Sequence, residues 1–305
     1  MPKAVLEGLK KYPVKITAIS AMLDSGGFAG KERRLFKTGV AFGDIRRAAL
    51  AMSEAPKDKK ELFASRFENG AVLANSYCTS ITSSFGLEDL SESLKEDLNI
   101  PEGREILPAT LDNAQLCAQL ENGQFVTGET NIDVPKHDAN LRIKKVFLEP
   151  EARAFEPAVR AIQGADLIVM GPGDLYSSLA QILLVKGISE AIRHSRASKI
   201  YVCNLMTKRG ETDNFSVVHF AFEIERYMKG PLDYIIFNKK EISPQRLSAH
   251  KKRHPENAAL VKFYKISGGK RFIAADVAAE NGPIAHDSDK LAKVILSLCP
   301  TSIKQ

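Results

Sequence analysis

Two aspartates early in the chain are the first residues whose chemistry stands out. Asp24 lies in the segment LDSGGFAG, directly after an apolar run, and Asp44 lies in the segment GDIR. Mg²⁺ is bound by one or two carboxylates together with phosphate oxygens and water, so these two side chains can hold this ion jointly. The alternative is structural. An aspartate before glycine is common in turns, and Asp44 can cap the helix IRRAALAM, which the residues alone favour.

A second candidate site follows the apolar run ADLIVM. Gly171 and Gly173 of the GPGD turn let backbone N–H groups approach a ligand, and Ser177 or Ser178 can donate to phosphate oxygens at the start of the next helix. The sequence therefore indicates an anion cradle, although a tight strand-to-helix turn explains GPG equally well. Asp174 would repel a phosphate unless a cation lies between them.

The loop after the next apolar run, KIYVCNL, carries further polar side chains. Open α/β sheets bind ligands in the crevice at the carboxyl ends of their strands, and this loop neighbours the GPGD loop there. The candidate ligand-binding residues in it are Asn204, Thr207, Glu211 and Thr212. Alternatively, Thr212 or Asp213 caps the helix that begins near Phe215. We expect His219, inside that helix, to be structural because no paired nucleophile lies nearby.

Strand-length apolar runs recur along the chain, and several precede helical periodicity, which is typical of a parallel sheet wrapped by helices. We expect an α/β fold, a Rossmann-like parallel sheet flanked by helices, with strands at 14–20, 142–148, 166–170, 199–205, 233–238 and 261–266. Helical spacing marks 87–98, 179–192 and 215–228. Residues 68–140 are less regular. We interpret them as an irregular central insertion or cap within a single domain spanning 1–305, because no linker marks their edges.

The charge of the chain is concentrated in one segment. The net charge is +6, and residues 238–271 carry 10 basic and 2 acidic side chains. Phe263 and Tyr264 are the only aromatic residues there, so the segment offers little surface for stacking on bases. We therefore expect no nucleic-acid partner and interpret this basic segment as a solvated face or an anion-facing loop.

Apolar runs and cysteine spacing indicate where in the cell the protein is expected. No apolar run approaches the ~18 residues of a membrane span, and MPKAVLEGLKKYPVK lacks the apolar core of a secretory signal. We expect a cytoplasmic protein without membrane contacts, and a homodimer is the default assembly. The cysteines are far apart and form no C-x-x-C pair, so we expect free thiols at Cys78, Cys117, Cys203 and Cys299.

These segments, in this order, resemble the CofD/YvcK-like family. The landmarks are DSGG with GDIR, ILPAT at 106–110, GE at 128–129, ADLIVMGPGDLYSS, and YVCNLMTKRGET followed by His219, covering about residues 4–238. The resemblance implies a Rossmann-like domain that binds a nucleotide or a nucleotide-diphosphate conjugate. It places Asp24 and Asp44 near the acceptor or metal, as catalytic and metal-binding residues. It places the nucleotide near Gly171, Gly173, Asp174, Ser177, Asn204, Thr207, Glu211 and Thr212.

The sequence departs from this family pattern in three places. The family opens with a strand and a GGGTG-like phosphate loop, whereas this sequence begins MPKAVLEGLKKYP. The segment LANSYCTS stands where the family shows a GHS-x-GN-type string, with Asn75 in place of the histidine. Phe28 and Ala29 replace small polar residues, and Asp174 replaces a serine. Each lost charge-assisted hydrogen bond weakens ligand binding by roughly 1.5–3 kcal/mol.

The resemblance implies two activities. One branch, YvcK-like, binds a nucleotide-sugar such as a UDP-sugar and acts in cell-envelope growth or carbon metabolism. Transferase members use Mg²⁺ to move a phospholactyl-type group from a nucleotide donor to a deazaflavin acceptor. The DSGG and NLMT-x-x-GET strings look closer to the first branch, so nucleotide-sugar binding is the leading hypothesis. The transferase is the alternative, and a scaffold that keeps the fold without a ligand is the third.

Overall fold

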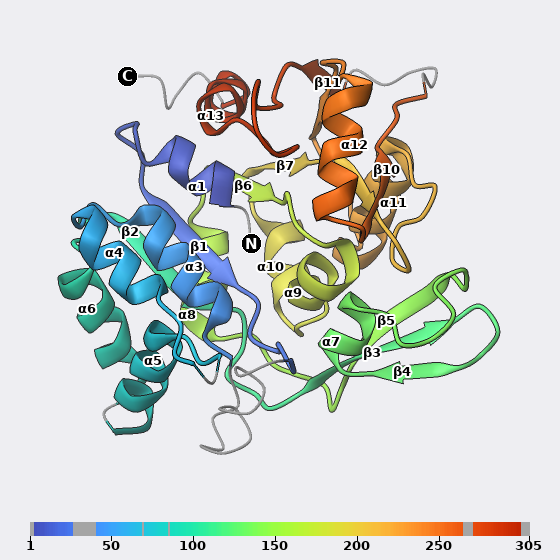
Figure 1. Cartoon of the computed structure of the whole chain (residues 1–305). Coiled ribbons are helices and arrows are strands. Elements are labelled where there is room, and N and C mark those ends of the chain that lie inside the picture. The colour runs from blue at the N-terminus through green and yellow to red at the C-terminus, as the bar shows by residue number, and fades with distance from the viewer. Residues whose placement is uncertain (1–2, 27–40, 69, 85, 265–270, 300–305) are drawn as a thin grey trace.

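A four-stranded parallel sheet forms the centre of the molecule (Figure 1). The computed structural model describes residues 3–26, 41–68, 70–84, 86–264 and 271–299. The strand order in the sheet is β11-β9-β7-β6, and all neighbours run parallel. The strands are β6 (Leu167–Met170), β7 (Ser198–Val202), β9 (Tyr234–Asn238) and β11 (Phe272–Ala275). Their carboxyl ends lie at one edge, where the two predicted ligand loops begin.

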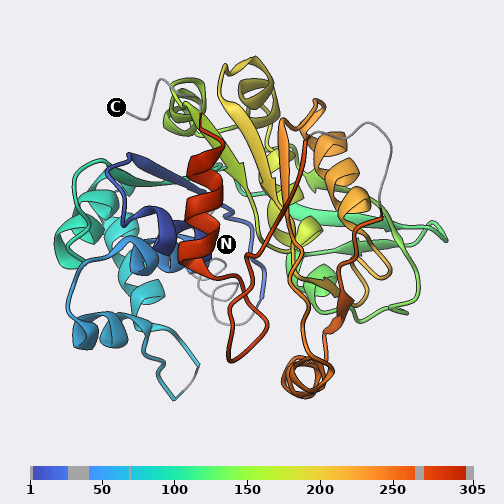
Figure 2. The same cartoon turned by 90° about the horizontal axis from the view of Figure 1, so that it is seen from above.

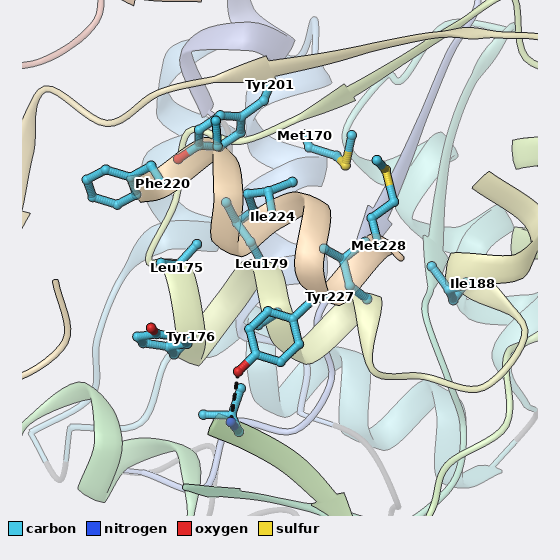
Figure 3. Close-up of a cluster of buried hydrophobic side chains, with 14 of the residues drawn as sticks. Met170, Leu175, Tyr176, Leu179, Ile188, Tyr201, Phe220, Ile224, Tyr227 and Met228 are labelled. Atoms are coloured by element: carbon cyan, nitrogen blue, oxygen red, sulfur yellow. Dashed lines mark hydrogen bonds between the residues drawn. The ribbon is translucent and has the colours of Figure 1, made fainter. Parts of the chain in front are cut away.

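Helices cover both faces of this sheet, which explains why its strands are apolar throughout. Side chains alternate between the faces of a strand, so Ile200 and Val202 pack against α1 and α13, whereas Tyr201 points to the opposite layer. That layer contains η1, α9, α10 and α11, and Figure 3 shows its packed side chains, among them Phe220 and Ile224. In Figure 2, α13 runs along one side of the central strands.

The helices on the two faces are short. Those of the first face are α1 (Lys3–Leu9) and α13 (Ser288–Ser297). Those of the second face are the π-helix η1 (Leu175–Ala180), α9 (Gln181–Leu183), α10 (Ile188–His194) and α11 (Val217–Met228). A further helix, α8 (Glu156–Gln163), packs against α10. The predicted helices at 179–192 and 215–228 are therefore confirmed, the first in three pieces.

A second parallel pair forms its own sheet beside the first. β1 (Ile16–Ser20) pairs with β2 (Arg104–Pro108), and no pairing among the described residues joins this pair to the central sheet. Four helices pack on it or on one another around a separate core: α3 (Gly43–Met52), α4 (Lys57–Ala64), α5 (Leu73–Ser84) and α6 (Leu87–Asp97). The amphipathic helix predicted at 87–98 is thus confirmed.

An antiparallel sheet completes the architecture, in the order β4-β3-β5. Its strands are β3 (Gln115–Leu120), β4 (Phe125–Thr127) and β5 (Ile143–Glu149), and α7 (Glu129–Asp133) follows β4. A short antiparallel pair joins β8 (Met206–Lys208) to β10 (Asn257–Leu260), and α12 (Pro244–Arg253) precedes β10.

The expected parallel sheet flanked by helices is confirmed, with three local differences. The strand at 142–148 exists as β5, but it belongs to the antiparallel sheet and not to the parallel one. The strand predicted at 261–266 is wrong where it is described, because β10 ends at Leu260 and Lys262 makes only an isolated bridge; 265–266 lie outside the described residues. The middle of the chain holds more regular structure than its sequence indicated, including β2, β3 and α5.

Two further expectations concern cysteines and membranes. None of the four cysteines forms a disulfide, as predicted. Within the described part of the chain, no helix is long and apolar enough to cross a membrane.

Candidate functional site

The two predicted ligand loops lie side by side at the carboxyl ends of β6 and β7. The side-chain amide of Asn204 bridges them: its Oδ1 accepts from the Gly173 N–H at 3.1 Å, and its Nδ2 donates to the Gly173 carbonyl at 2.9 Å. The predicted neighbourhood is thus present. The Gly173 N–H that the sequence reserved for a ligand already has a side-chain partner here.

The helix after the GPGD turn begins at Leu175 as a π-helix, a form that occurs frequently at functional sites. The Asp174 carbonyl accepts from the Leu179 N–H at 2.9 Å, which is the five-residue spacing of that helix. The Tyr176 N–H donates to Glu211 at 3.2 Å. A carboxylate of the protein itself therefore occupies the N-terminal end that was predicted to receive a phosphate.

Gly171 has a packing reason for being glycine. Its φ is +79°, and a Cβ there would lie 2.7 Å from the Val202 carbonyl oxygen. A side chain at this position would push β6 away from β7.

Glu211 is the buried centre of a charge cluster that the sequence did not reveal. Lys208 Nζ lies 3.1 Å from Glu211 Oε1 and 3.2 Å from Asp174 Oδ2, and it also forms an ion pair with Asp133. Burial raises the pKa of Glu211 to about 7, an effect that Lys208 opposes. Burial lowers the pKa of Lys208, but the three carboxylates outweigh it and hold that pKa above its ordinary value. Ser177 Oγ donates to Glu211 at 3.1 Å, so the cluster fixes η1 to the second loop.

The two predicted threonines make local contacts. Thr207 Oγ1 accepts from the Ala259 N–H at 3.0 Å and so holds β8 to β10. Thr212 Oγ1 accepts from the Lys208 N–H at 2.9 Å and closes the turn between them. Neither Thr212 nor Asp213 caps α11: the cap is Ser216. His219 completes this cap, since its Nδ1 accepts from the Ser216 N–H at 3.0 Å, and its predicted structural role is confirmed.

The loop that carries Asp24 docks on the start of α7. The Thr130 N–H donates to Ser25 Oγ at 3.2 Å, and Asp24 Oδ1 accepts from the Gly26 N–H at 2.8 Å. Gly26 is required by this contact, because a Cβ there would lie 2.1 Å from Thr130 Oγ1. Residues 27–30 of LDSGGFAG, with Phe28 and Ala29, lie outside the described residues.

The docking brings Asp24 against Glu129, a residue to which the sequence assigned no chemistry. Glu129 is hydrogen-bonded to Asp24, and burial, followed by repulsion from Asp24 and Asp133, raises the pKa of Glu129 to about 8. Glu129 therefore holds a proton more readily than an ordinary carboxyl group does. Such a carboxyl pair can accept or return a proton at a bound hydroxyl group.

Asp44 lies in the first turn of α3 and does not cap it, because Phe42 occupies the cap position. Its carboxylate pairs with Arg47 at 2.8 Å. The helix-cap alternative for Asp44 is therefore wrong in detail, although an acid in a first turn still favours the helix dipole.

Asp24, Asp44, Asp174 and Ser177 line one cavity of about 400 Å³. Its lining also contains the acids Glu129 and Asp133 and three arginines, Arg46, Arg47 and Arg66. The second ligand loop is not part of the described lining, which includes none of Gly171, Gly173, Asn204, Thr207, Glu211 and Thr212. That loop contacts the lining indirectly, because Glu211 binds Ser177 and Lys208 binds Asp174.

The donor set of the cavity fits a cation only in part. No group of three His, Cys, Asp or Glu side chains among the described residues is arranged to hold a metal ion. Mg²⁺ needs fewer protein ligands, because phosphates and water complete its octahedron. Asp24 and Asp44 both line the cavity and are the carboxylates that would hold an ion arriving with a phosphorylated ligand.

The basic segment 238–271 borders the second ligand loop. β10 pairs with β8, and the Arg209 N–H donates to the Glu256 carbonyl at 2.8 Å. None of its described residues lines the cavity.

Comparison with known proteins gives concordant matches. A family model described as 2-phospho-L-lactate transferase CofD matches residues 3–277. A gluconeogenesis factor from Halalkalibacterium halodurans is 35% identical over 306 residues, covering 96% of this chain and 91% of the relative. The gluconeogenesis factor of Bacillus subtilis is 34% identical over 306 residues, covering 96% and 93%.

Two further comparisons concern length and structure. A relative from Clostridium acetobutylicum is 34% identical over 303 residues, and the chain spans 66% of its length. A crystal structure of a UPF0052-family protein from Bacillus halodurans is similar with a TM-score of 0.87 at 33% identity, covering 96% of each chain.

Proposed function

Because the chain belongs to the CofD family, we propose that it binds the diphosphate of a nucleotide-sugar in the cavity between Asp24 and Asp174. The observation that carries this proposal is the mixed charge of the cavity wall. Carboxylates alone would repel a diphosphate, and arginines alone would need no metal. A wall that contains both suits an anion that is bound together with a divalent cation.

In this proposal, carboxylates bind the cation and a hydroxyl group binds the phosphates. Asp24 and Asp44 would hold Mg²⁺, with Asp44 exchanging its ion pair with Arg47 for the metal, and the ion would neutralise the diphosphate. Ser178, which lines the cavity beside Ser177, donates a hydroxyl hydrogen bond to the phosphate oxygens, whereas the single hydroxyl proton of Ser177 is directed to Glu211. Glu211 and Lys208 keep η1 in place and so set the position of these serines.

The test is calorimetric titration of a UDP-sugar into the protein, with MgCl₂ or with EDTA. We expect binding that needs Mg²⁺, and a loss of at least about tenfold in affinity for Asp24→Asn, because a neutral amide is a poor Mg²⁺ ligand. The fold should survive, since an asparagine Oδ1 can still accept from the Gly26 N–H. Asp58→Asn, on the exposed surface of α4, is the matched control. Binding that is equal in EDTA, or unchanged in Asp24→Asn, contradicts the metal role.

A transferase is the second candidate, and the Asp24–Glu129 carboxyl pair favours it. An acceptor hydroxyl would attack the phosphorus that carries the phospholactyl group. A new phosphorus–oxygen bond forms, the bond to the nucleotide breaks, and the nucleoside monophosphate leaves. The hydroxyl proton passes to the Glu129 carboxylate, because Asp24 would hold the metal. Incubation with a nucleotide-activated phospholactate, Mg²⁺ and a deazaflavin should then give a phosphodiester by mass spectrometry, and absence of product leaves binding alone.

The cellular role that follows from nucleotide-sugar binding is one in cell-envelope growth or carbon metabolism, in the cytoplasm. Its test is expression in a Bacillus subtilis strain that lacks its own gluconeogenesis factor. We expect restored growth from the wild-type chain and none from Asp24→Asn. If neither nucleotide binding nor rescue is found, the chain is a scaffold that retains the architecture alone.

A further inference from the structure

The wall of the cavity formed by α3 and α5 contains buried polar atoms without partners. Asn75 is only 5% exposed and lines the cavity, yet its Oδ1 has no hydrogen-bond partner among the described residues. Arg46 lines the same cavity, and its Nε is likewise buried without a partner in the described part of the chain. Buried polar atoms of native proteins nearly always have partners, so exceptions require an explanation.

Helix packing holds these two side chains at the cavity. α3 buries Ile45 and Ala49 in the separate core around β1 and β2, which directs the neighbouring Arg46 to the edge of that core. α5 packs on α3, and Cys78, one turn after Asn75, lies near Arg46. Both side chains are therefore fixed by the fold from two separate helices.

The three arginines of the cavity lining lie close enough to act on one another electrostatically. Arg46 is half-buried, and burial followed by repulsion from Arg47 and Arg66 lowers the pKa of its guanidinium. Asp44 is the acid that opposes this effect, and it is already paired with Arg47 at 2.8 Å. Three guanidinium groups this close to one another, only one of which is paired with Asp44, favour an incoming anion.

We propose that Arg46, Arg66 and Asn75 form a subsite for an anionic group that also carries a hydroxyl, as in a sugar phosphate. Arginine donates hydrogen bonds and never accepts them, so it selects anionic oxygens. The Asn75 Oδ1 is an acceptor that lacks a donor, so it selects an O–H group beside the anion. The inference rests on the proposed function only in sharing its cavity, and it places the sugar-phosphate end of the ligand on the wall of α3 and α5.

The test compares two small phosphate monoesters of equal charge by calorimetry at pH 8, in EDTA and without nucleotide. Methyl phosphate supplies the anion alone, and glycerol 3-phosphate adds hydroxyl groups. We expect glycerol 3-phosphate to bind at least about fivefold more tightly. Arg46→Gln should weaken both ligands by about tenfold or more, whereas Asn75→Leu should remove only the preference between them.

The controls separate a loss of the subsite from a loss of the fold. Arg160→Gln, on the exposed surface of α8, should bind both ligands as the wild type does. If Asn75→Leu fails to fold by circular dichroism, Arg66→Gln, at an exposed position, replaces it and should weaken both ligands. Equal affinity for the two ligands, or affinities unchanged in Arg46→Gln, overturns the subsite.

The outcomes also separate the subsite from the proposed function. If a UDP-sugar binds with Mg²⁺ but glycerol 3-phosphate does not bind at all, the subsite is wrong and nucleotide binding stands. If glycerol 3-phosphate binds as expected but no nucleotide binds, the subsite stands and the proposed function is wrong.

Discussion

Among the described residues, Lys208 forms ion pairs with the largest number of carboxylates. Its ammonium group contacts carboxylates from three segments: Asp133, Asp174 and Glu211. Lys208 is also where sequence reasoning fell short, because Asp133 lies 75 residues away and no spacing rule connects the two. The lysine three residues before Glu211 in KRGET was the only local signal.

Replacing Lys208 by methionine should be strongly destabilising. It leaves Glu211 buried without its cation, and removing one partner of a buried ion pair costs about 3–5 kcal/mol. The double variant Lys208→Met/Glu211→Gln should recover much of that free energy of unfolding, since no buried charge remains. Denaturant unfolding of the two single variants and the double variant measures this coupling. Strictly additive effects would show that the pair does not interact.

At the scale of elements, strands were easier to find than their partners. The apolar run at 142–148 was correctly located as a strand, but periodicity does not say which strand lies beside it. Side chains of α11 cover the outer edge of this strand. Tyr227, labelled in Figure 3, accepts a hydrogen bond at its Oη from the Val146 N–H at 2.9 Å. Arg226 donates to the Lys144 carbonyl at 3.0 Å. An edge so covered cannot pair with a further strand.

Tyr227→Phe tests this edge contact. The variant leaves the buried Val146 N–H without an acceptor, so we expect a loss of about 1–3 kcal/mol in the free energy of unfolding. Hydrogen exchange at the Val146 amide should accelerate in parallel. Tyr264→Phe, at an exposed tyrosine, is the control and should change neither quantity. Unaltered exchange at Val146 would mean that the tyrosine hydroxyl does not hold the edge.

For the whole molecule, the sequence predicted the layered architecture and one wall of the cavity. Strand-length apolar runs and helical spacing are local, so they indicated β6, β7, β9 and α11 correctly. The cavity also depends on packing between distant helices, which brings Arg46 and Asn75 into the same lining as Asp174. Asn75 was noticed only as a departure from a family string, and no local pattern shows that its amide oxygen is buried without a partner.

His286 links the last part of the chain to β7 and should make the stability of the molecule pH-dependent. Its Nε2 donates to the Cys203 carbonyl at 3.2 Å, and burial lowers the pKa of His286 to about 4 despite that contact. The unfolded chain binds this proton at higher pH than the folded chain. Stability from His286 is therefore complete above about pH 6.5 and falls as the pH drops toward 4, by up to roughly 3 kcal/mol in all.

The measurement is the free energy of unfolding between pH 7 and pH 4.5 for the wild type and His286→Gln. The free energy of unfolding of His286→Gln should depend less steeply on pH, because the variant has no imidazole to protonate at this position. His194→Gln, at an exposed histidine, serves as the matched substitution and should retain the slope. Identical slopes in the wild type and His286→Gln would rule out this source of acid sensitivity.

The central claim is that one cavity accepts a diphosphate with a divalent cation between the Asp24 loop and η1. The most direct measurement is an anomalous difference map from crystals grown with MnCl₂ and a UDP-sugar. We predict a manganese peak beside Asp24, with the diphosphate between it and Ser178. A ligand seated elsewhere, or a map with manganese only outside this cavity, would contradict the account.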